Sequence, residues 1–105
     1  MKYLKVVILI SALFSVIAHS ASNSGYVNKI YADPTNIVIV LNNGDGAYVN
    51  GQCGSYFYHI NRSLVNFKEF YALILAAAAS KKEVNLQVGG CESQRNILTH
   101  GHVKF

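Results

Sequence analysis

Several residue types are scarce in this sequence, and their scarcity narrows what the protein can be. It has no Trp, one Pro and two Cys, and only 13% of its residues are charged, which leaves little material for a charged active site. The G-x-S-x-G motif of serine hydrolases is missing, and five acidic residues stand singly at expected turns, helix ends and loops. These absences indicate that the protein is not an enzyme.

Residues 1–20 have the three parts of a secretory signal peptide. Lys2 and Lys5 precede an apolar run over residues 6–17, and Ala18-His19-Ser20 has small residues at the positions that signal peptidase requires. A membrane-spanning helix needs about 20 apolar residues, and polar residues end this run earlier. We therefore predict cleavage after Ser20, with residues 21–105 forming a single secreted or periplasmic domain that has no membrane span.

The charge of the cleaved chain argues against a nucleic-acid partner. The whole sequence has nine Lys and Arg against five Asp and Glu, and losing Lys2 and Lys5 leaves seven basic residues. Binding through the phosphate backbone needs a dense basic stripe, which a net charge near +2 does not supply.

Cys53 and Cys91 are the only cysteines in the chain. In an exported protein an isolated pair favours one disulfide, which would contribute about 4 kcal/mol to a domain of this size. The alternative is a metal site, but no Cys-x-x-Cys or Cys-x-His spacing provides further ligands. We expect a disulfide, with no metal and no cofactor.

Hydrophobic patterning predicts a mainly β fold with one α-helix. Alternation, β-branched runs and turn residues predict strands over residues 26–31, 36–41, 47–49, 55–60, 83–88 and 97–105. Residues 21–24 are predicted to be a frayed end, and Gly89-Gly90 to be a turn. The predicted order is three or four strands, one helix and then two strands. This is the order of elements in a small OB-like β-barrel.

The helix is predicted over residues 67–80, with Asn66 as N-cap and Glu69 completing a capping box. An apolar stripe that includes Phe70 and Ile74 is expected to face the core. The opposite side has a small, nearly uncharged face, formed by Ala72, Ala76 and Ala79. This face is suited to close packing against another copy of the chain.

The segment 66–91, NFKEFYALILAAAASKKEVNLQVGGC, resembles a pattern in small exported bacterial proteins similar to the B subunit of subtilase cytotoxin. There an aromatic-rich helix leads into a V-x-L-x-V strand and a cysteine. Asp33-Pro34-Thr35-Asn36 before a β-branched strand, and Cys53 before an aromatic strand, fit the same scheme. The resemblance covers about residues 25–105.

This resemblance implies an OB-like fold, a Cys53–Cys91 bridge and assembly into a homo-oligomeric ring with the helices at its centre. The toxin subunits bind cell-surface glycans, so a glycan or a partner protein is the expected ligand. None of their sugar-binding residues can be placed on this sequence.

Two sets of side chains are candidates for binding. Tyr56 and Tyr58 fall on one side of their strand, where paired phenols could stack on a sugar; the alternative is that one face is core and the other an ordinary half-buried sheet surface. His100 and His102 share a strand face, but zinc needs a third ligand, and exposed polar residues account for them better. We expect His59 to be a packed histidine.

The function that these observations favour is a secreted or periplasmic, non-enzymatic binding module whose ligand is a glycan. Two alternatives stay open at this point. One is a small cell-envelope enzyme or inhibitor acting through polar loops, and the other is a structural envelope protein with no small ligand.

Overall fold

The structure is a computed structural model that describes residues 21–105. The predicted signal peptide and its cleavage site lie outside the described residues.

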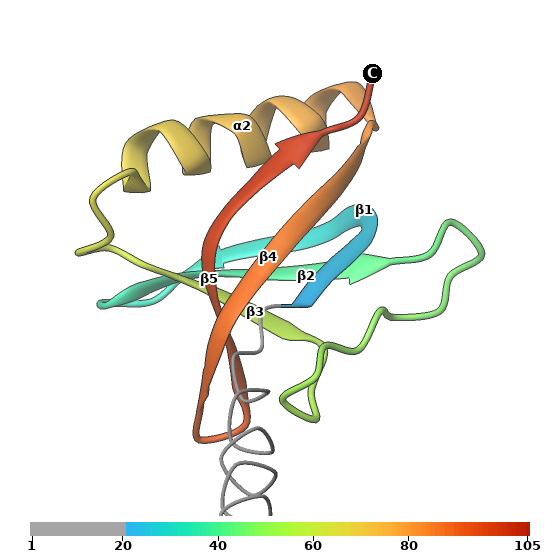
Figure 1. The fold of residues 1–105 in the computed structure, drawn as a ribbon. Helices are drawn as coiled ribbons and strands as arrows, with labels where there is room; N and C mark the ends of the chain where they lie inside the picture. Colours follow the sequence, from blue (N-terminus) through green and yellow to red (C-terminus); the bar gives the residue numbers. More distant parts are fainter. Residues whose placement is uncertain (1–20) are drawn as a thin grey trace, which may run out of the picture.

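Five strands form one sheet (Figure 1), and they correspond to five of the six predicted strands. The strands are β1 (Ala21–Ala32), β2 (Asn36–Asn42), β3 (Phe57–Asn61), β4 (Glu83–Glu92) and β5 (Arg95–Val103). Their order is β1-β2-β3-β5-β4, and the sheet closes because β4 also pairs with β1. All neighbours are antiparallel except β3 and β5, which run parallel.

The single helix of the described chain, α2 (Phe67–Ser80), connects β3 to β4 and has the predicted bounds. It lies across one end of the closed sheet (Figure 1) and buries Phe70, Ile74 and Ala77 against the core. The predicted capping box is wrong, because the Asn66 side chain makes no cap hydrogen bond and donates instead to the carbonyl oxygen of Thr99. The helix is held in place by its buried face and by this tie to β5.

The core fills the inside of the closed sheet beneath α2. Alternate residues of β2, β3 and β4 point into it, among them Ile39, Tyr58 and Leu86, all with no exposed surface. Strand β2 is buried on both faces, as its β-branched run predicts, because Val38 and Val40 on its outer side are covered too. The register places Val38 between Tyr31 of β1 and His59 of β3, so these side chains cover the outer face of β2.

Three local predictions are wrong. Residues 21–24 are not a frayed end, since Ala21 pairs with Val88 and Ser24 with Asn85 in the β1–β4 ladder. Gly89-Gly90 is not a turn but part of β4, at a bulge where a Cβ on Gly89 would overlap the Thr99 side chain. Residues 47–49 form no strand, and only a single bridge joins Tyr48 to Asn42.

The predicted disulfide is present and joins Cys53 to Cys91. It joins the long β2–β3 loop, which precedes α2 in the sequence, to the C-terminal end of β4, which follows α2. Among residues 21–105, no helix has both the length and the apolarity needed to cross a membrane.

Candidate functional site

A buried asparagine positions the end of the β2–β3 loop. Asn96 has no exposed surface; its side-chain oxygen accepts from the Cys53 amide at 3.1 Å, and its nitrogen donates to the carbonyl oxygens of Ser55 and Phe57 at 2.9 Å each. Gly51 makes room for this amide group, because a Cβ there would overlap it. The network and the adjacent disulfide fix the segment 51–57, which includes Tyr56 and Phe57.

Four aromatic side chains lie in an unbroken row, two from the β2–β3 loop, one from β3 and one from β1. The row runs from Tyr48 to Tyr56 and on to Phe57, with ring centres 4.6 Å apart at each step, and ends at Tyr31, 6.5 Å from Phe57 with its ring nearly perpendicular. Tyr48 is 41% exposed and Tyr31 45% exposed, while Tyr56 and Phe57 are half-buried between them. We call these four residues the aromatic row.

Tyr56 and Tyr58 are predicted from the sequence to bind a sugar together, but only Tyr56 lies where a ligand could reach it. Tyr56 belongs to the aromatic row, but Tyr58 lies wholly inside the core, where its hydroxyl donates to the carbonyl oxygen of Val49 at 3.0 Å. A side chain with no exposed surface cannot stack on a ligand, so the prediction for Tyr58 is wrong. The two tyrosines differ because Tyr56 precedes β3, whereas Tyr58 is within the strand and points inward.

The aromatic row leads into a hollow of about 360 Å³. We call it the His59 hollow. Its lining comes from β1, the β2–β3 loop, β3, the β4–β5 turn and the start of β5: Tyr31, Ser55, Phe57, His59, Ser93, Gln94 and Arg95. Tyr31 and Phe57 belong both to the row and to the hollow. Aromatic faces and polar groups therefore meet at one place on the surface.

His59 is the most buried polar group of this hollow. It is 7% exposed, and its Nδ1 atom is buried without a hydrogen-bond partner in the described chain. Burial lowers the pKa of His59, and the nearby Arg95 charge lowers it further, while Asp33 and Glu92 act weakly in the opposite direction. The imidazole is therefore neutral at pH 7. The prediction of a packed histidine agrees with its burial.

The β4–β5 turn has a backbone that its residues do not favour. Glu92 pairs with Arg95, so the turn consists of Ser93 and Gln94, whose φ angles are 49° and 65°. Turns of this kind are usually formed by Asn and Gly, since other side chains are strained at positive φ. The turn is anchored to the end of the β2–β3 loop because the Ser55 hydroxyl donates to the Gln94 carbonyl oxygen at 2.8 Å. Two strained residues with polar side chains thus line the hollow.

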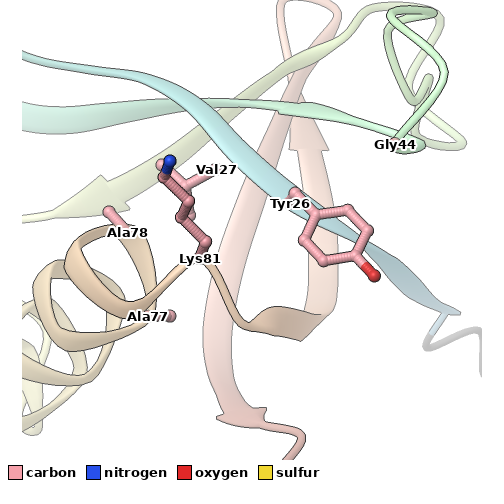
Figure 2. A pocket seen from close by; sticks show the side chains of 6 residues that line it. All are labelled: Tyr26, Val27, Gly44, Ala77, Ala78 and Lys81. Atoms are coloured by element: carbon pink, nitrogen blue, oxygen red, sulfur yellow. The ribbon is translucent and has the colours of Figure 1, made fainter.

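A second hollow, of about 540 Å³, lies between the end of α2 and β1 (Figure 2). Ala77 and Ala78 come from the helix and Val27 from the strand, and Lys81 extends between the two elements. This lining is largely apolar, and neither of the two unpartnered buried side-chain atoms of residues 21–105 belongs to it. We therefore place the candidate site at the aromatic row and the His59 hollow.

The remaining candidates are dispersed over the surface. His100 and His102 are exposed on β5, and no group of three or more His, Cys, Asp or Glu in residues 21–105 could hold a metal ion. Ala72, Ala76 and Ala79 are exposed on α2, beside Leu73 and Leu75, which are 39% and 45% exposed. The outward side of the helix is thus more apolar than the alanines alone suggest.

Sequence reasoning missed most of the residues at this site. Tyr31 and Arg95 are far apart in the chain and come together through the β1–β2–β3 register and the parallel β3–β5 pairing. Tyr48 joins them through its bridge to Asn42 and its contact with Tyr56. The local signals were the aromatic segment 56–58 and a turn without Gly at 93–94, but neither indicates which distant residues join them.

No protein-family model matches the chain, and a search of curated proteins finds no match either.

Proposed function

We propose that the protein is an exported, non-enzymatic binding module, secreted or periplasmic, whose aromatic row and His59 hollow bind a glycan. The observation on which this rests most is the aromatic row itself: four rings in contact one after another, partly open to solvent and continuous with a polar hollow. Tyrosine rings combine an apolar face with a polar hydroxyl, which matches the alternating surface of a sugar.

The fold that accompanies this proposal is an OB-like barrel. In its favour are the closed strand order, the parallel β3–β5 pair and the position of α2 between β3 and β4. Barrels of this kind bind oligosaccharides and oligonucleotides on their strand faces and adjoining loops. The weak net charge expected of the cleaved chain favours a sugar over a nucleic acid.

Export is supported by the disulfide, because such bonds persist in the periplasm and outside the cell and are rare in the cytosol. The resemblance of segment 66–91 to the toxin B-subunit group supports both export and glycan recognition. The same resemblance, together with the exposed apolar side of α2, supports self-association of the protein.

A glycan array with the labelled protein tests the proposal, followed by titration of any sugar that binds. Tyr31→Ala and Tyr48→Ala each remove one exposed ring of the row and are expected to weaken binding about threefold to tenfold. Tyr26→Ala is the matched control, because Tyr26 is 37% exposed but lies at the other hollow. A blank array, or an equal loss in the Tyr26 variant, would contradict the proposal.

A further inference from the structure

The β3–β5 pairing is the shortest ladder of the closed sheet within residues 21–105. It consists of two residue pairs, Tyr58 with Asn96 and His59 with Ile97, whereas every other neighbouring pair of strands has at least five. It is also the one parallel pairing of the described sheet, and parallel ladders are slightly less stable per residue. We call these two pairs the β3–β5 seam, and it is the place where the sheet opens most readily.

The two ends of the β3–β5 seam are held unequally. At one end the buried Asn96 side chain bonds to the segment before β3, and the Cys53–Cys91 disulfide lies beside it. Beyond the other end, the described chain has a single exposed hydrogen bond, from the Asn66 side chain to the Thr99 carbonyl oxygen at 3.3 Å. An opening is therefore hinged at the Asn96 end and widest at the opposite end.

His59 lies at the weakly held end of the seam. Its side chain is 7% exposed, and Nδ1 is buried without a hydrogen-bond partner in the described chain. An imidazolium carries an N–H on both ring nitrogens, so protonation would leave a buried donor at Nδ1 without an acceptor. It would also place a positive charge where little water can reach it. The closed seam therefore disfavours the charged form of His59.

Three charges act on His59 from the neighbouring elements. Arg95 at the start of β5 disfavours the imidazolium, while Asp33 in the β1–β2 turn and Glu92 at the end of β4 favour it. Burial and Arg95 outweigh the two carboxylates, so the pKa of His59 is lowered. Hydrogen bonds from two backbone amides hold the pKa of Asp33 below its usual range, so Asp33 stays charged while His59 titrates. Tyr31 brings a phenol from β1 to the same hollow.

From these observations we propose that the β3–β5 seam is an acid-sensitive latch, in which protonation of His59 opens the closed sheet between β3 and β5. In the open state water reaches Nδ1, and the imidazolium is no longer held close to Arg95. Because the charged ring is favoured only there, acid shifts the population toward the open state.

The sign of the effect follows from the two states of the ring. In the open state His59 has its ordinary pKa of 6.5, and in the closed state the pKa is lower. The closed seam therefore keeps its full stability above pH 6.5 and loses it progressively as the pH falls below that value.

The latch acts on the candidate site, because the His59 hollow spans the seam. Phe57 and His59 come from β3 and Arg95 comes from β5, so opening separates the walls of the hollow. This inference goes beyond the proposed function and does not depend on which ligand the hollow binds.

Hydrogen exchange of the backbone amides, followed by NMR of the ¹⁵N-labelled protein with its disulfide intact, tests the latch. Rates at pH 7.5 and pH 5.5 are expressed as protection relative to the unfolded chain, which removes the direct effect of pH on exchange. We expect protection in segments 58–60 and 97–99 to fall up to about tenfold more than protection in the β1–β2 ladder. The Cys53 amide, which donates to Asn96 at the hinge, should keep its protection.

Variants separate His59 from the other titrating groups. His59→Gln should make protection at the seam independent of pH over this range, because the titrating ring is gone. His100→Gln is the matched control, since it removes an exposed histidine of β5 and should leave the response unchanged.

Two exposed substitutions test the latch without replacing the buried ring. Arg95→Gln should weaken the acid response, because it removes a charge that repels the imidazolium in the closed state. Glu92→Gln should strengthen the response, because it removes a charge that attracts the imidazolium.

Unchanged protection at pH 5.5 would overturn the inference, as would an equal fall in the β1–β2 ladder, which indicates global unfolding. An equal fall in the wild type and His59→Gln, or a response that His100→Gln abolishes, would assign the effect to another group. If Arg95→Gln and Glu92→Gln change the response in the same direction, the charges around His59 do not control the seam.

Discussion

At the scale of single residues, burial of Tyr58 in the core changes the acidity of its hydroxyl group. Its ring is surrounded by the closed sheet, and its hydroxyl is bonded to Val49. Burial raises the pKa of Tyr58 to about 12, because the phenolate would lose its hydration there. The folded protein therefore holds this proton more tightly than the unfolded chain, in which the pKa is 10.0.

The sign of the pH effect follows from that difference. The contribution of Tyr58 to stability is complete below pH 10 and is lost as the pH rises from 10 to 12. We expect the free energy of unfolding to fall over this range by up to about 2.7 kcal/mol more in the wild type than in Tyr58→Phe. At pH 7 the variant should be less stable by about 1 kcal/mol, because it lacks the bond to Val49.

Urea unfolding at a series of pH values measures both effects. Tyr31→Phe serves as control, since Tyr31 is 45% exposed and should leave the alkaline fall unchanged. If the wild type and Tyr58→Phe lose stability in parallel above pH 10, the burial of this phenol does not govern the alkaline response.

The role of a single tyrosine is harder to predict than the strand that contains it. The segment Ser55–Ile60 is aromatic enough to be recognised as a strand, but β3 is covered on both sides, so alternation does not show which side is core. Tyr31 meets Phe57 only because β2 lies between their strands and sets the register. That pairing is a property of the folded sheet and not of any local pattern.

At the scale of elements, the β4–β5 hairpin has a strained turn that lines the His59 hollow. Replacing Ser93-Gln94 by Asn-Gly gives the turn the residues that positive φ favours, and we expect the free energy of unfolding to rise by about 1 kcal/mol. The same double variant should weaken binding of the sugar at the proposed site, because both residues line the hollow.

Lys81→Gly is the matched control for that experiment. Lys81 ends α2 with φ 56° in the left-handed region, where Gly is the usual residue, and it lies outside the His59 hollow. Lys81→Gly should raise stability by a similar amount and leave sugar binding unchanged, as thermal unfolding and titration can show. A Ser93-Gln94 double variant that is more stable but binds the sugar unchanged would mean that the turn side chains do not contact the ligand.

Elements with strong local signals are the ones that the sequence predicts well. The helix is predicted residue for residue because Gly and Pro are missing from it and five alanines favour it, and the buried run of β2 is equally distinct. The N-terminal part of β1 was missed because its polar residues gain order only by pairing with β4, more than 60 residues later. The Gly89-Gly90 prediction failed since a close approach of Thr99, and not a turn, requires glycine there.

At the scale of the whole molecule, the exposed side of α2 bears on the number of copies that associate. We expect the protein to self-associate through the face formed by Ala72, Ala76 and Ala79, so that its mass in light scattering is a multiple of one chain. Ala76→Glu should give a monomer, because a buried unpaired carboxylate is costly. Asn28→Glu, an exposed change on β1, should leave the mass unchanged. A monomeric wild type at high concentration would contradict this expectation.

The sheet closes by pairing of β1 with β4, so synthesis of β4 sets the earliest time at which folding can finish. Ala21 pairs with Val88, so β1 gains its second neighbour, β4, only after most of the chain has been synthesised. At about 5–20 residues per second, the ribosome adds the intervening stretch in roughly 3 to 13 seconds. During that interval β1 has no β4 to pair with, and the sheet stays open. A chain that closes so late stays threadable through a narrow translocation channel, which a domain completed early on the ribosome would not be.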